Sequence, residues 1–203
     1  MSARPLVISD CDEVLLHFVT PFEAYLQSVH DLTLKLDSFA LAGNIRNAKG
    51  EAIEMTAFPS LLDGFFDTHM PTQTPAPHAV ESLAALAETC DIVILTNLGD
   101  RYNAPRTAEL RRLGMPYRVV TNQGPKGAPV AALVAEYRPS ATVFIDDLPP
   151  HHSSVKRASP DVRRLHMVAD AQLQPLIPPA IDADARIDDW PAALLRIQSW
   201  FGR

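Results

Sequence analysis

Two carboxylates stand two residues apart near the start of the chain, where a short apolar run ends. Residues 6–8 are apolar and mostly β-branched, which is typical of a buried strand, and Asp10 and Asp12 follow them. Paired carboxylates can act as nucleophile and as proton donor or acceptor, and they can also bind a cation. Alone, the pair is not specific, because Asp-x-Asp also occurs at helix caps, turns and calcium loops.

Three further sets of polar residues follow in order along the chain. Two of them stand at the ends of apolar runs, at 91–95 and 142–145, and the third opens a helical pattern near residue 127. In an open parallel sheet, ligands bind outside the carboxyl ends of the strands. Residues far apart in the sequence are therefore expected at one edge of the sheet. The three sets are Thr96 with Asn97, Lys126, and Asp146 with Asp147.

The acidic residues would crowd this edge of the sheet. Two carboxylates about 4 Å apart repel by roughly 4 kcal/mol at an effective dielectric of about 20. Asp10, Asp12, Asp146 and Asp147 would form several such pairs. A divalent cation removes this repulsion, and an all-oxygen ligand set favours Mg²⁺ held by few protein groups and several waters. The sequence therefore predicts a Mg²⁺ cofactor.

Alternating strand and helix patterns must position these side chains. Strand patterns lie at 6–8, 92–95, 117–121, 143–145 and 162–168, and helical patterns lie at 77–88, 105–113, 129–137 and 191–201. Such alternation indicates a parallel sheet that is covered by helices on both faces. The expected fold class is α/β, with a doubly wound, Rossmann-like parallel sheet.

The stretch 20–74 interrupts this alternation with a small, mostly helical insertion. Its helical patterns cover 22–30, 51–58 and 61–70. Pro59 is predicted to separate the last two of these helices, and 32–37 fits either a strand or a helix end. Several prolines after residue 70 mark the return to the alternating pattern. We therefore expect a core made of 1–19 and 75–203.

The composition excludes several classes of function. With 203 residues and 47% hydrophobic content, the chain can build one soluble core domain with a modest insertion. A net charge of -6 and scattered arginines provide no basic surface for nucleic acid. No apolar stretch approaches the roughly 18 residues that span a bilayer, and the N-terminus has no signal-peptide core. Cys11 and Cys90 are not spaced as a metal or disulfide framework, which favours a reduced, cytoplasmic setting.

The four motifs in this order resemble those of the haloacid dehalogenase superfamily. That family has Asp-x-Asp-x-Thr/Val after the first strand, Thr or Ser after the second, a Lys, and an acidic pair after a later strand. Here the motifs read Asp10-Cys11-Asp12-Glu13-Val14, Thr96, Lys126 and Asp146-Asp147. The resemblance runs from the N-terminus to about residue 147, and it identifies the insertion as the small cap that this family places after the first strand.

The resemblance implies a role for each catalytic residue. Asp10 attacks phosphorus and forms an aspartyl phosphate, while Asp12 protonates the leaving oxygen and later activates water. One carboxylate can face phosphorus in line while the other reaches the leaving group, because the backbone turns between them. Thr96 hydrogen-bonds a phosphoryl oxygen, with the amide of Asn97 beside it. Lys126 neutralises the aspartyl phosphate and orients Asp10.

The resemblance also implies the metal ligands. The ion takes the Asp10 carboxylate, the Asp12 backbone carbonyl and the Asp146 carboxylate, and Asp147 binds it directly or through water. In the same loop, Cys11 is expected to offer its backbone N–H to the substrate.

Four other polar residues stand near the motifs. Glu13 is expected to be solvated. His151 and His152 could touch the substrate or the metal, but a surface loop is the favoured expectation. Arg101, just after the second motif, is a further candidate for contact with the substrate.

These inferences predict a Mg²⁺-dependent phosphohydrolase that acts on a small phosphomonoester through an aspartyl phosphate on Asp10. Asp12 argues against the dehalogenase branch of the family, whose members generally lack an acid at that position. The partner is expected to be a small phosphorylated molecule, with no nucleic acid and no membrane. The sequence identifies neither the substrate, which is chosen largely by the cap, nor the oligomeric state.

Two other classes of protein are alternatives to this prediction. A response-regulator receiver also has an acidic cluster, a Thr, a Lys and Mg²⁺ on a doubly wound sheet. Receivers, however, place the acidic pair at the first strand and the phosphorylated Asp at the third, and they have no inserted cap. A catalytically silent binding protein on the same fold is the second alternative, and the intact motif set argues against it.

Overall fold

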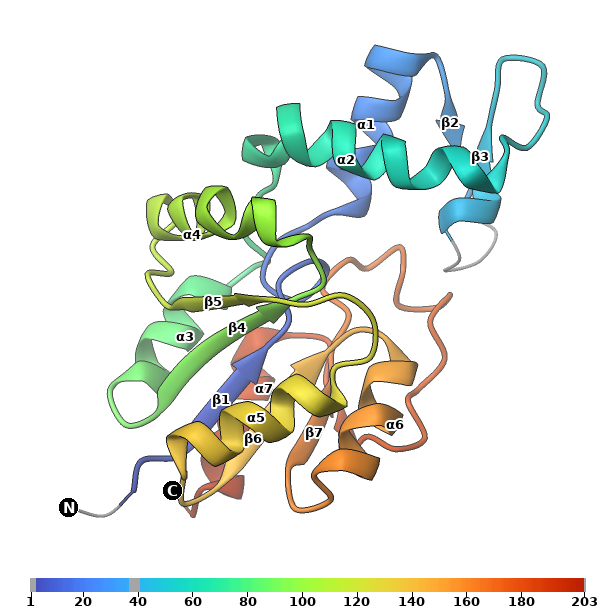
Figure 1. The fold of residues 1–203 in the computed structure, drawn as a ribbon. Helices are drawn as coiled ribbons and strands as arrows, with labels where there is room; N and C mark the ends of the chain where they lie inside the picture. The colour runs from blue at the N-terminus through green and yellow to red at the C-terminus, as the bar shows by residue number, and fades with distance from the viewer. Residues whose placement is uncertain (1–2, 37–40, 203) are drawn as a thin grey trace.

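A parallel sheet forms the centre of the protein (Figure 1). The computed structural model describes residues 3–36 and 41–202. Within them, the strands of the main sheet are β1 (Leu6–Ser9), β4 (Asp91–Thr96), β5 (Arg118–Thr121), β6 (Thr142–Asp146), β7 (Arg163–His166) and β8 (Ala185–Arg186). Their order is β5-β4-β1-β6-β7-β8, and all neighbours run parallel. The α/β fold class with a doubly wound sheet is confirmed.

β1 lies inside the sheet, between β4 and β6. Its apolar residues face the two sides in turn, so that Val7 packs into the core on one face and Ile8 into the core on the other. Ser9 pairs in register with Ile94 of β4 and Ile145 of β6. The three strands therefore end at nearly the same level, and the residues that follow them meet at one edge of the sheet.

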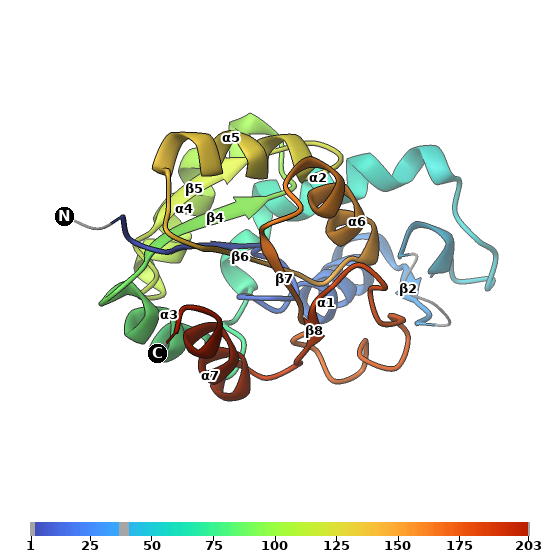
Figure 2. The same cartoon turned by 90° about the horizontal axis from the view of Figure 1, so that it is seen from below.

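Helices cover both faces of the sheet. They are α3 (Ala79–Ala87), α4 (Asn103–Arg112), α5 (Gly127–Tyr137), α6 (Pro149–Ala158) and α7 (Trp190–Trp200). Leu83 of α3 and Ile197 of α7 share one core with Val7, while Val130 of α5 and Val155 of α6 share the core on the opposite face. Figure 2 shows α3 and α7 on one side of the strands and α5 and α6 on the other.

The segment between β1 and α3 lies beyond the carboxyl ends of β1 and β4 (Figure 1). It contains α1 (Val19–His30), β2 (Thr33–Leu34), the 3₁₀ turn Leu41–Asn44, β3 (Ile45–Arg46), the 3₁₀ turn Met55–Ala57, α2 (Phe58–Thr68) and the 3₁₀ turn Met70–Thr72. β2 and β3 form a small antiparallel sheet of their own. We refer to residues 20–74 as the cap.

The cap has an aromatic core of its own. Phe22 of α1 and Phe65 of α2 are fully buried, and their rings meet edge to face with centroids 5.6 Å apart. The same cluster also takes in Tyr102, Val168 and Leu173 from the rest of the chain. Because the cap shares its core with the surrounding segments in this way, its separation as a domain of 20–74 stays a prediction.

The cap differs from the sequence-based expectation at one helix boundary. Pro59 does not separate two helices but lies in the first turn of α2, where its missing N–H removes no helical hydrogen bond. The helix predicted over 51–58 is wrong, because only the turn Met55–Ala57 precedes α2. Within 32–37, Thr33–Leu34 form a strand, and Asp37 falls outside the described residues.

Two elements of the core were not predicted. α6 follows the acidic pair directly, and β8 adds a short strand at one end of the sheet.

Among the described residues, none of the helices combines the length and the hydropathy that crossing a lipid bilayer requires.

Candidate active site

Asp10 follows β1 and is buried, with only 6% of its surface exposed. Its backbone N–H donates to the carbonyl of Ile145 at 2.8 Å, which continues the pairing of β1 with β6 for one more residue. Its Oδ1 accepts from the backbone N–H of Cys11 at 2.7 Å and lies 2.7 Å from Nζ of Lys126. Burial raises the pKa of Asp10 to about 7 against the opposing charge of Lys126, and the Asp146 carboxylate adds to the rise.

Lys126 connects the first motif with the last. Its fully buried ammonium lies 2.7 Å from Oδ1 of Asp10 and 2.7 Å from Oδ2 of Asp146. Burial disfavours the charged ammonium, but the two carboxylates outweigh it and raise the pKa of Lys126. The ammonium of Lys126 therefore forms ion pairs with both acids, as expected for a residue that orients Asp10.

The acidic pair stands at the end of β6, inside the protein. Oδ1 of Asp146 accepts from the backbone N–H of Leu148 at 2.9 Å. Burial raises the pKa of Asp146, but the charge of Lys126 outweighs it and holds that pKa below its usual value. Burial raises the pKa of Asp147 well above its usual range, and the charges of Asp146 and Asp10 add to the rise.

These carboxylates could hold a metal ion. Asp10, Asp146 and Asp147 each offer an oxygen, and the ligand atoms all lie within 4.8 Å of one another. The raised pKa values of Asp10 and Asp147 show that burial and mutual repulsion disfavour their charged forms. A divalent cation would reverse this effect, and the all-oxygen donor set suits Mg²⁺. The residues present therefore fit Mg²⁺.

Thr96 is the last residue of β4 and is completely buried. Within residues 3–36 and 41–202, its hydroxyl has no hydrogen-bond partner, which costs about 1–3 kcal/mol when such a group is buried. A ligand oxygen would satisfy it. Beside it, the amide of Asn97 donates to the carbonyl of Gly124 at 3.0 Å and lies 3.3 Å from Nε2 of His151.

Asp12 is held by a polar network that its sequence neighbours do not supply. The guanidinium of Arg106 donates to its two carboxylate oxygens at 3.0 and 3.3 Å, and the Gln73 amide donates to Oδ1 at 2.7 Å. Arg106 is fully buried on α4 and also contacts Glu109 and Gln73. The Asp12 side chain therefore lies toward α4 and the end of the cap, which leaves its backbone carbonyl as the group predicted to bind metal.

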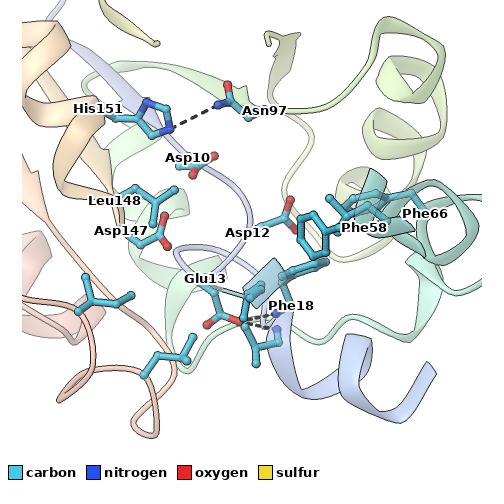
Figure 3. Close-up of a pocket in the computed structure, with 15 residues that line it drawn as sticks. Asp10, Asp12, Glu13, Phe18, Phe58, Phe66, Asn97, Asp147, Leu148 and His151 are labelled. Carbon is cyan, nitrogen blue, oxygen red and sulfur yellow. Dashed lines mark hydrogen bonds between the residues drawn. The ribbon is translucent and has the colours of Figure 1, made fainter. Parts of the chain in front are cut away.

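A pocket of about 270 Å³ opens beside these acids (Figure 3). Asp10, Asp12, Asp147 and Asn97 line it on the side of the sheet. Side chains of the cap close it on the opposite side, with the rings of Phe58 and Phe66 near Asp12 (Figure 3). The carboxylates are thus accessible to a small molecule held between the sheet and the cap.

No protein-family model and no curated protein matches the sequence. Solved structures do match along nearly the whole chain. YfnB of Bacillus subtilis, described as a HAD-hydrolase bound to magnesium, has a TM-score of 0.66 and 14% identity, covering 97% of this chain and 99% of that chain. A haloacid dehalogenase-like hydrolase of Streptococcus pneumoniae has a TM-score of 0.66 and 9% identity, covering 98% of each chain. A predicted phosphoglycolate phosphatase of Haemophilus somnus has a TM-score of 0.65 and 17% identity, covering 95% of this chain and 97% of that chain.

The chain has the haloacid dehalogenase-like fold. This confirms the fold that the order of the motifs predicted. Because the identities are so low, the likeness establishes the fold alone.

Glu13 stands in the first motif loop of this haloacid dehalogenase-like fold, and the expectation that it is solvated is wrong. It is buried, and its Oε1 accepts from the backbone N–H groups of Phe18 and Val19, each at 2.7 Å. Burial raises its pKa to about 7. Its φ of 60° is left-handed, which costs a non-glycine residue roughly 1–2 kcal/mol. These two hydrogen bonds offset that cost and tie the motif loop to the start of α1.

The histidines after the acidic pair are also placed differently than expected. His151 and His152 lie in α6, which begins with two prolines, and both are buried, so the expected surface loop is wrong. Nε2 of His152 lies 3.0 Å from the carbonyl oxygen of Asp146, and burial lowers the pKa of His152 to about 4. A neutral His152 therefore packs behind the acidic pair. Consecutive prolines at a helix start were the sequence signal that could have shown this.

Arg101 contacts the cap. Its guanidinium lies 2.9 Å from a carboxylate oxygen of Asp63 and 3.6 Å from one of Asp67, both on α2. Contact with a substrate stays a prediction for this residue. Arg106 is a second cation at the site beside Lys126, and the sequence could not identify it, because its partners Asp12 and Gln73 lie 94 and 33 residues away.

Proposed function

We propose that the protein is a Mg²⁺-dependent phosphohydrolase that cleaves a small phosphomonoester through an aspartyl phosphate on Asp10. The contact of Lys126 with both Asp10 and Asp146 carries this proposal, because it joins a nucleophile candidate, a fixed cation and a metal-ligand candidate in one buried group. The unpaired Thr96 hydroxyl adds a donor for a phosphoryl oxygen. Solved structures of this fold described as phosphatases, and one described as bound to magnesium, support it.

The Asp10 carboxylate would make the first attack. Its contacts with Cys11 and Lys126 both fall on Oδ1, which leaves Oδ2 to form the bond to phosphorus. Mg²⁺ held by Asp10, Asp146 and Asp147 would neutralise negative charge on the phosphoryl group. Lys126 favours the ionised form of Asp10 and fixes its position, so that little reorganisation is needed during attack.

Asp12 would act first as the general acid and then as the general base. As the bond from phosphorus to the leaving oxygen breaks, Asp12 gives its proton to that oxygen, and the alcohol departs. Asp12 then removes a proton from the water that attacks phosphorus in the aspartyl phosphate, which frees Asp10 and releases phosphate. The contacts with Arg106 and Gln73 fix the position from which it would act.

The direct test is release of inorganic phosphate from a panel of small phosphomonoesters, measured with Mg²⁺ and with EDTA. We expect Mg²⁺-dependent turnover of at least one compound. Phosphate release that is equally fast in EDTA would contradict the metal-dependent mechanism, and no release from any phosphomonoester would contradict the proposed function.

Replacing Asp12 by Ala should affect substrates unequally. An alkyl leaving group needs a proton during bond cleavage, whereas an aryl leaving group departs more readily without one. We expect kcat/KM to fall about a hundredfold to ten-thousandfold for alkyl phosphates, in line with the usual size of acid–base catalysis, and much less for aryl phosphates. Steady-state rates of both substrate classes with both proteins measure the ratio. Equal losses of kcat/KM for alkyl and aryl phosphates would contradict the role of Asp12 as the general acid.

Replacing Thr96 by Val tests the unpaired hydroxyl at nearly constant volume. A hydrogen bond to a charged group contributes about 1.5–3 kcal/mol, so kcat/KM should fall by about tenfold to a hundredfold. The melting temperature should not fall, because the valine leaves no buried hydroxyl without a partner. Thr96→Ser is the matched control, since it keeps the hydroxyl, and we expect it to retain most of the activity. Loss of stability without loss of activity in Thr96→Val would assign the hydroxyl a structural role.

A further inference from the structure

The pocket beside the catalytic acids has strongly apolar walls. Nine of its fifteen lining residues are aliphatic or aromatic. From the start of α1 and from α2 come Phe18, Phe58, Leu62 and Phe66, and from the loop after β7 come Leu173 and Ile177. A wall of this kind binds apolar groups by removing their surface from water.

The aromatic part of this wall is held in a fixed arrangement. The rings of Phe18 and Phe66 are stacked, with centroids 5.7 Å apart and planes inclined by 16°. Phe18 also stacks on Phe22, which is fully buried in the cap. The wall is therefore organised before a ligand arrives, which lowers the entropy cost of binding.

The charged residues of the pocket are all acidic. They are Asp10, Asp12, Glu13 and Asp147, and among the described residues no lysine or arginine lines the pocket. The nearby cations are engaged elsewhere, since Lys126 contacts Asp10 and Asp146, and Arg106 contacts Asp12 and Glu109. A second anionic group on a substrate would lose its hydration without gaining a cationic partner, which is unfavourable.

We propose that the pocket selects phosphomonoesters whose alcohol portion is a small apolar group, aliphatic or aromatic, and rejects those that carry a second anion or several hydroxyls. This inference rests on the proposed function, because it assumes that the phosphoryl group lies at the acidic end. The volume of about 270 Å³ is near the lower limit of ligand pockets, about 300–1,000 Å³, so the apolar portion is small.

The test compares primary alkyl phosphates whose leaving groups have similar chemistry. Ethyl, propyl and butyl phosphate form an apolar series, and glycerol 1-phosphate and phosphoglycolate are the polar and anionic comparators. Burial of one methylene contributes about 0.8 kcal/mol, so kcat/KM should rise about fourfold for each added methylene. We expect butyl phosphate to exceed both comparators by at least about tenfold, because they place unpaired polar groups against the apolar wall.

A charge placed on the wall should change this preference. Leu62 lies on α2, is half-buried and lines the pocket. In Leu62→Lys we expect the kcat/KM ratio of phosphoglycolate to butyl phosphate to increase at least tenfold, because the lysine supplies a partner for the carboxylate. Leu62→Met is the matched control, since it conserves volume and polarity, and it should keep the wild-type order of substrates. Thermal melts of both variants separate a change of preference from a loss of fold.

The outcomes separate the two proposals. A fourfold rise per methylene together with a shift in Leu62→Lys supports the apolar pocket. A kcat/KM for phosphoglycolate or glycerol 1-phosphate at or above that for butyl phosphate would overturn the apolar selection. It would not contradict the proposed phosphohydrolase activity. Absence of Mg²⁺-dependent turnover for every phosphomonoester would overturn both.

Discussion

Asp10→Asn is expected to lower kcat by at least about a thousandfold while leaving the fold intact. The amide that replaces the carboxylate is a poor nucleophile, so the covalent route is lost. The fold should persist because Lys126 keeps Asp146 as a partner at 2.7 Å, and because the variant removes a buried acid whose charge is disfavoured. Phosphate release by the purified variant measures the loss, and a thermal melt verifies the fold.

A trapping experiment provides the control for this substitution. Acid quenching of the wild-type protein during turnover of a phosphorus-labelled substrate should leave label on the protein, and Asp10→Asn should show none. Asp161→Asn is a matched control, since this exposed acid lies outside the site. It should retain both the turnover and the label. Near-normal turnover in purified Asp10→Asn would contradict the covalent role of Asp10.

Asp146→Ala is expected to abolish activity and most of the stabilisation by Mg²⁺. A metal that binds only the folded protein stabilises it by about 2.7 kcal/mol at 100 times its dissociation constant. In the wild type, millimolar Mg²⁺ should therefore raise the melting temperature above that measured in EDTA. Removal of Asp146 deletes one of three clustered carboxylates, so the rise should nearly disappear. Thermal melts of both proteins, with Mg²⁺ and with EDTA, measure the difference.

The structure changes one part of this expectation. From the sequence, removal of one repelling charge suggests a more stable metal-free variant. Asp146 also contacts the fully buried Lys126, however, so its removal takes away one of two partners of a buried ammonium. Loss of a buried ion-pair partner is destabilising, and we expect metal-free Asp146→Ala to melt below the metal-free wild type. An equal Mg²⁺-dependent rise in wild type and variant would mean that Asp146 is not a metal ligand.

The sequence by itself determined the sheet, apart from β8, and the edge at which the motifs meet. Each strand that carries a motif is a short apolar run, and polar residues such as Asp10, Thr96 and Asp146 mark its end. Such signals are local, because side-chain alternation and the point at which an apolar run stops are properties of neighbouring residues. Parallel pairing then brings the strand ends together whatever the length of chain between them.

Tertiary structure decided which polar groups are buried and what each of them contacts. Glu13 looks like a solvated loop residue in the sequence, but the folded chain buries it and directs it to the start of α1. His152 likewise becomes the buried neighbour of Asp146. Whether a polar side chain is buried depends on elements distant in sequence that pack over it. A local sequence pattern does not show which elements these are.

The same reason explains the environment of Asp12 and the character of the pocket. Arg106, 94 residues from Asp12, and Gln73 hold its carboxylate only because α4 and the end of the cap pack against the first motif loop. The apolar wall likewise combines residues of α1 and α2 with Leu173, which follows the last long strand. The sequence thus specified where the candidate catalytic groups stand, because strand ends are set locally. Packing between distant segments decided their partners and the surface that a substrate would meet, because those depend on contacts that form only in the folded chain.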